Sequence, residues 1–170
     1  MSSADAVDRE AAWLASYSAA DGLPGLLRAF GGPFDVVQAR RPRTPPKRRR
    51  CLFVLRRTIV VERFGFNRKI NHYGFELQIE WPQTSPSGQA ESVQADLDAA
   101  VELVIQRING PLTIPPNGTL DKTHGARFMS VAENPATISV VFADPEQTLQ
   151  ANADLTCSIT YQADDKDYTS

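Results

Sequence analysis

The residues of this chain that could carry out acid–base or nucleophilic chemistry are few and widely spaced. Its 170 residues include two histidines, His72 and His124, and two cysteines, Cys51 and Cys157. A catalytic histidine needs a nucleophile and an orienting acid within hydrogen-bond reach. Asp121 precedes His124 by three residues, but no serine or cysteine stands in a nucleophile turn such as G-x-S-x-G. We therefore expect no enzymatic activity, and a structural or contact role for His124.

Motifs for metal or nucleotide binding are also missing from the sequence. It contains no C-x-x-C, no H-E-x-x-H, no acidic calcium loop and no G-x-x-x-x-G-K-[ST] phosphate loop. We expect no metal and no cofactor. Both cysteines lie in apolar runs, which predicts buried, reduced thiols rather than a disulfide framework.

The strongest functional signal is the basic stretch ARRPRTPPKRRR at residues 39–50. Seven of its twelve residues are basic, three are proline and none is acidic. Proline excludes a regular helix and removes the hydrogen-bond donors of a strand, and like charges extend a chain, so an exposed loop is expected. We predict that this loop and the strand after it contact a partner through nine bases: Arg40, Arg41, Arg43, Lys47, Arg48, Arg49, Arg50, Arg56 and Arg57.

Charge patterning alone leaves three interpretations of the basic loop open: a protein contact, a nucleic-acid contact and a merely solvated loop. Exposed Lys and Arg side chains can displace counterions from phosphates without a groove-reading helix. However, no aromatic residue lies between Arg40 and Arg50, so this loop offers no base stacking. The pattern favours contact with an acidic protein surface.

Charge is unevenly distributed along the chain, although the formal net charge is only −2. Residues 40–69 hold twelve bases and one acid, whereas residues 130–170 hold seven acids and one base. Such a polarised chain can present a positive and a negative surface at once. Copies of it could therefore meet head to tail.

The elements that must position these residues follow from hydrophobic periodicity. Residues 72–81 alternate strictly between apolar and polar, which predicts a strand with one buried face, and residues 92–109 carry a helical apolar stripe. Further strands are expected at 51–62, 127–133, 136–142 and 154–161. Short helices are expected in residues 1–38, one of them from Pro24 to Phe30, a turn at 64–71, and a frayed polar end at 162–170.

This order of elements predicts an α+β fold, because strands occur in runs rather than in strict alternation with helices. We expect a mostly antiparallel sheet of four to five strands with the long helix packed on one face. The chain is expected to be one domain, made of an N-terminal helical segment (1–38), the basic loop (39–50), an α+β core (51–163) and a polar tail (164–170).

Membrane and secretion signals are not found. The N-terminal MSSADAVDRE is acidic and lacks the basic start and apolar middle of a signal peptide, and no apolar run approaches the roughly 18 residues of a membrane span. We expect a protein that is made and assembled in a cytoplasm and has no membrane partner.

The second half of the chain resembles a known family. The stretches ADLDAAVELVIQRINGP, DKTHGARFMSVAENP, ISVVFADPEQTL and ADLTCSITYQADD resemble small structural proteins of tailed bacteriophages, and the size and element order are similar to those of tail terminators. The resemblance covers roughly residues 51–165. It implies an α+β fold and a ring of six copies in the virion that caps the tail tube and joins it to the head connector or stopper protein.

The resemblance implies a mechanism without chemistry, in which genomic DNA passes through the ring without sequence-specific binding. Ring closure needs two different, complementary surfaces on each copy. As a hypothesis, residues 40–57 of one subunit would meet the acids near the C-terminus of the next. The alternatives are a neck or head-completion protein of the same assembly and a nucleic-acid-binding module that uses the basic loop.

Overall fold

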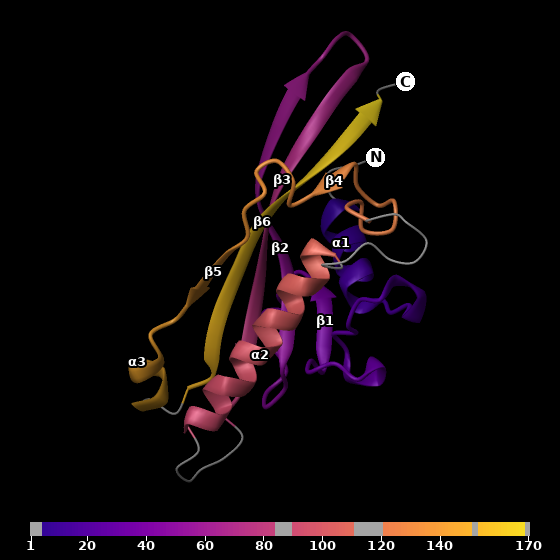
Figure 1. Ribbon diagram of the computed structural model, residues 1–170. Helices are drawn as coiled ribbons and strands as arrows, with labels where there is room; N and C mark the ends of the chain where they lie inside the picture. The colour runs from indigo at the N-terminus through magenta and orange to yellow at the C-terminus, as the bar shows by residue number, and fades with distance from the viewer. Residues whose placement is uncertain (1–4, 84–89, 111–120, 151–152, 169–170) are drawn as a thin grey trace.

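Over the residues that the structure describes, the fold is α+β, with one six-stranded mixed sheet and three α-helices (Figure 1). The structure is a computed structural model that describes residues 5–83, 90–110, 121–150 and 153–168. The elements are α1 (Asp5–Ala15), 3-10 turns at Ala19–Asp21 and Arg28–Phe30, β1 (Val36–Ala39), β2 (Cys51–Arg63), β3 (Arg68–Trp81), α2 (Ala90–Asn109), β4 (Ser130–Val131), β5 (Ser139–Phe142), α3 (Pro145–Gln150) and β6 (Leu155–Tyr168).

The sheet is mixed, because β1 runs parallel to β2 whereas the other pairings are antiparallel. The strand order is β1-β2-β3-β6-β4, and β5 pairs with β6 as well. The prediction of four to five strands was therefore too low. Strand β1 was missed because its four residues are too few to show a period of two. The helix predicted from Pro24 to Phe30 is only a 3-10 turn, which ends at Gly31 with φ 80°.

Three long strands, β2, β3 and β6, form the centre of the sheet (Figure 1). The alternation predicted for 72–81 is confirmed, because Tyr73, Phe75, Leu77, Ile79 and Trp81 are all buried. The frayed end predicted at 162–170 is wrong, since β6 pairs with β3 as far as Tyr168. The polar tail stays in the sheet because Asp164 pairs with His72 of β3 and Asp165 pairs with Arg9 of α1.

One hydrophobic core cluster joins the sheet to the helices. The buried stripe of α2 (Val93, Leu97, Ala100, Val101, Val104 and Ile108) belongs to the same cluster as the inward side chains of β3 and β6 and the apolar side chains of α1. In Figure 1 α2 runs in front of the sheet, and α1 lies on the β1 side. In the part of the chain that the structure describes, no helix lies over the end of the sheet that holds the β2–β3 turn (Figure 1).

Arg107 fixes the end of α1 rather than lying on the surface of α2. Its side chain is buried, donates hydrogen bonds to the carbonyl oxygens of Trp13 and Ser16 at 2.9 Å each, and lies 4.4 Å from the centre of the Trp13 ring. The last carbonyls of a helix have no partners within the helix. The Arg107 guanidinium on α2 thus supplies hydrogen-bond donors to carbonyl groups at the C-terminal end of α1.

Candidate partner-binding surface

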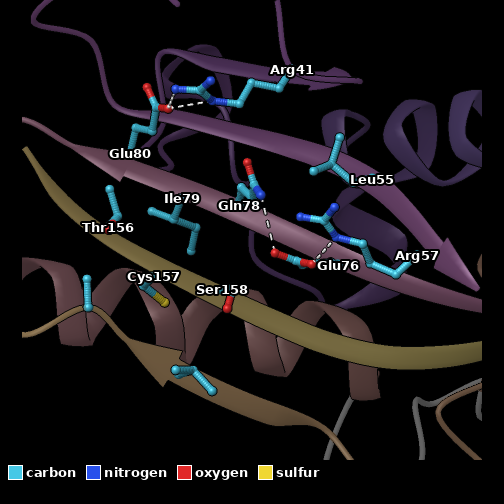
Figure 2. Close-up of a pocket in the computed structure, with 12 residues that line it drawn as sticks. Arg41, Leu55, Arg57, Glu76, Gln78, Ile79, Glu80, Thr156, Cys157 and Ser158 are labelled. Carbon is cyan, nitrogen blue, oxygen red and sulfur yellow. Dashed lines mark hydrogen bonds and ion pairs between the residues drawn. The ribbon is translucent and has the colours of Figure 1, made fainter.

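The basic loop is anchored to the sheet at both of its ends. The Arg41 guanidinium lies 2.7 Å from a carboxylate oxygen of Glu80, an ion pair drawn in Figure 2. The Arg50 guanidinium lies 4.1 Å from the centre of the Trp81 ring and 3.8 Å from Asp96. Since Glu80 and Trp81 end β3, the loop lies at the end of the sheet opposite the β2–β3 turn.

A groove of about 660 Å³ runs over the polar face of the sheet beside this loop (Figure 2). Glu76 accepts hydrogen bonds there from Arg57 and from Gln78. The Arg57 guanidinium holds the pKa of the Glu76 carboxyl below its ordinary value. The charged groups in the groove therefore pair with one another. Arg41 and Arg57 both form ion pairs within their own chain.

Some of the predicted contact residues interact within the chain, whereas others have no ion-pair partner among the described residues. Arg40 pairs with Asp8 at 3.0 Å, and Arg56, which is half-buried, also interacts within the chain. Four others are exposed and form no ion pair with any residue that the structure describes: Arg43, Lys47, Arg48 and Arg49. The candidate contact surface of the loop is therefore narrower than the nine bases predicted.

Two acids near the C-terminus are not surface charges. Asp165 lies 2.9 Å from Arg9, and Asp164 lies 2.6 Å from the His72 ring. Both acids are buried. The hypothesis that the basic region of one copy meets C-terminal acids of the next therefore loses these two carboxylates, because they already have partners within their own chain.

The sequence prediction missed an exposed apolar surface on the β2–β3 hairpin. The β2–β3 hairpin, with the end of β6 beside it, projects beyond the helices as an arm (Figure 1). Its exposed hydrophobic residues are Ile59, Val60, Val61, Phe64 and Phe66, and Phe66 is fully exposed. An available signal was the turn FGF, because two phenylalanines in a turn between charged residues are hard to bury.

The histidines and cysteines lie apart from this surface. His124 is buried and shares a hydrogen bond with Glu10, with 2.9 Å between its Nδ1 and the carboxylate oxygen. Its ring stacks on that of Trp13 with 3.5 Å between the ring centres. These contacts fit the structural role predicted for His124. Burial raises the pKa of Cys51 and of Cys157 to about 11, so neither thiol is ionised near neutral pH. Across the described ranges, no group of three potential ligands is placed to hold a metal ion.

Comparison with protein-family models and with curated proteins finds no match for this chain. None of the helices in the described parts of the chain is long and apolar enough to cross a membrane. We therefore infer the function from the surfaces of the basic loop and of the β2–β3 arm.

Proposed function

We propose that this protein is a virion structural protein of a tailed bacteriophage, a tail terminator whose copies close into a ring of six. The ring would cap the tail tube, join it to the head connector and let DNA pass. The sequence resemblance supports this proposal, and so does the α+β fold. We further propose that α2 packs on one face of the sheet, which its buried apolar stripe supports.

The observation that carries the proposal is that one copy offers two unlike contact surfaces at opposite ends of one sheet. The apolar arm lies at one end, and the exposed cations of the basic loop lie at the other. A closed ring stacked on other layers needs unlike surfaces of this kind, because head-to-tail contacts join different patches. The loop cations would face an acidic surface of the tail tube or the connector.

Two other functions remain candidates. A neck or head-completion protein of the same assembly would use the same surfaces one layer away. A nucleic-acid-binding module is favoured by the arm rather than the loop, because Phe64 and Phe66 lie among Arg63, Arg68 and Lys69. Exposed aromatics near cations can stack on bases. This candidate predicts DNA binding that weakens steeply with salt.

The loop contact is tested by replacing Arg48 and Arg49 with Gln and measuring binding of the variant to purified tail tubes by co-sedimentation. We expect self-assembly to be unchanged and tube binding to fall at least about tenfold, since several charged contacts contribute. The matched control is Ala99→Glu with Gln106→Glu on the exposed side of α2, which gives the same net charge. Equal tube binding by the loop variant and the control would contradict the proposal.

A further inference from the structure

The arm carries a surface whose partner is not found within its own chain. Ile59, Val60 and Val61 are consecutive, so they point to alternate faces of the hairpin, and all three are exposed. Over the described residues, β1 pairs with β2 only as far as Val54, so the edge of β2 is unpaired from there to the tip. Proteins seldom leave a long apolar strand edge uncovered. We therefore expect the surface of another molecule to cover the arm.

The tip of the arm is positively charged. Arg63, Arg68 and Lys166 are exposed there, and a small pocket of about 240 Å³ beside Phe64 is lined by three cations and no acid. Of the acids close to the tip in sequence, Glu62 lies 3.2 Å from the His72 ring, and Asp165, next to Lys166, lies 2.9 Å from Arg9. A surface that covers this tip should combine an apolar pocket with an acidic rim.

The same chain has such a pocket between α2 and the strands β5 and β6. Its volume is about 210 Å³, and it is lined by Leu97, Phe142, Ala143, Leu155, Gln94 and Asp98. An apolar cavity of about 150 Å³ can hold a benzene ring, so this pocket can accept a phenylalanine side chain. Phe142, which lines the pocket, is exposed.

The pocket is rimmed by acids. Asp98 lines it, and Asp144 and Asp154 are exposed directly after Ala143 and before Leu155. No base is among its lining residues. The charge of the pocket is therefore complementary to that of the arm tip, and its apolar lining suits Phe64 or Phe66.

The arm cannot reach the pocket of its own chain. Strand β3 has 14 residues and at about 3.3 Å per residue spans roughly 45 Å. Its first residue, Arg68, belongs to the arm, whereas its last, Trp81, pairs with Leu155 at the pocket. The two surfaces therefore lie at opposite ends of the sheet, and only another copy can bring them together.

We infer that the arm of one copy docks into the α2–β5–β6 pocket of the next, with Phe66 or Phe64 in the pocket and Arg63 and Arg68 against its acidic rim. The contact joins two different patches, so it propagates from copy to copy and closes into a ring if the rotation allows. This inference deepens the proposed function and rests on it for ring closure. Nucleic acid explains the arm less well, because aliphatic Ile59, Val60 and Val61 cannot stack on bases as aromatic rings do.

The decisive experiment is a charge swap in the full-length protein. One variant carries Arg63→Glu and Arg68→Glu in the arm, and the other carries Asp98→Arg and Asp154→Arg at the pocket. Each alone should lose at least about tenfold in self-association by sedimentation velocity, because like charges then face each other. An equimolar mixture should recover it by alternating the two variants. Ala99→Glu with Gln106→Glu on the exposed side of α2 is the control for added negative charge and should assemble like the wild type.

A cross-link reports the geometry directly. Asn67→Cys at the tip and Gln94→Cys at the pocket should give a disulfide-linked dimer only when the two single variants are mixed. The buried native cysteines provide an unreactive background. Cross-linking of the tip variant with itself would overturn the inference in favour of an arm-to-arm contact. Unchanged assembly of the arm variant with loss of oligonucleotide binding would overturn it in favour of nucleic acid.

These outcomes separate the inference from the proposed function. If the arm and pocket variants form rings as well as the wild type does, the inferred docking is wrong and the proposal of a ring-forming protein is retained. If the mixed cross-link forms but wild-type assemblies are open chains, the docking stands and the ring-forming terminator is wrong.

Discussion

At the scale of single residues, buried polar side chains find partners that are distant in sequence. Tyr161 donates a hydrogen bond to Glu10, which also binds His124, and these residues come from β6, α1 and the loop before β4. Glu10 could have been predicted as inward-facing, because it lies four residues after Ala6 and four before Leu14 on the buried stripe of α1. Its partners could not, since the sequence does not specify which distant elements meet.

His72 makes the stability of the arm depend on pH. Its ring contacts Asp164 at 2.6 Å and Glu62 at 3.2 Å, and the hydrogen bond to Asp164 raises the pKa of His72 above its ordinary 6.5 although burial opposes this. A raised folded-state pKa means stabilisation that is complete below the unfolded-state pKa and is lost as the pH rises through the folded one. We predict that the stability contributed by His72 falls as the pH rises above about 6.5.

The variant His72→Gln isolates this effect, because glutamine keeps hydrogen-bonding capacity but does not titrate. The difference in unfolding free energy between wild type and variant should shrink as the pH rises over the same range. A difference that grows with pH would contradict the assignment.

At the scale of elements, strong periodicity was predictive and weak or short patterns were not. Strand β3 and helix α2 follow from their sequences because the apolar spacing matches one period over many residues. The long arm was not predicted, because CLFVLRRTIVVE has no clean alternation and the exposure of Val60 and Val61 depends on where the helices stop. The extension of β6 to Tyr168 depends on pairing with β3, which local polarity does not reveal.

The arm contains a close approach between Gly74 and Thr58 that can be tested. A β-bulge shifts the register between Arg56 and Thr58, and a Cβ added at Gly74 would lie 2.1 Å from the Thr58 Oγ1. Threonine is stiff about χ1, so its hydroxyl cannot easily move away. We predict that Gly74→Ala destabilises the protein by about 1–3 kcal/mol, the usual cost of overpacking.

A second substitution should reverse most of that loss. Thr58→Ala removes the hydroxyl, and the new Cβ would then lie 3.3 Å from the Thr58 Cβ, a tight contact that small shifts relieve. Urea unfolding of the double variant should give a stability near that of Thr58→Ala alone. If the two substitutions are additive instead, the strain arises elsewhere in the arm.

At the scale of the whole molecule, the sequence indicated polarised charge but not its final distribution. Four of the nine predicted contact bases interact within the chain, and a fifth, Arg50, lies over Trp81 and beside Asp96; these interactions leave the cations of residues 43–49 exposed. Many of the charges counted along the sequence pair with side chains of other elements, so they are not available to a partner. The remaining charges and the apolar arm define the two surfaces on which the assembly proposal depends.

Light scattering with negative-stain imaging of the full-length wild-type protein over a range of concentrations tests the central claim most directly. We predict that copies associate head to tail into closed rings of a single size, six copies, in equilibrium with monomers. A protein that remains monomeric at every concentration, or that stops at a twofold dimer, would contradict it.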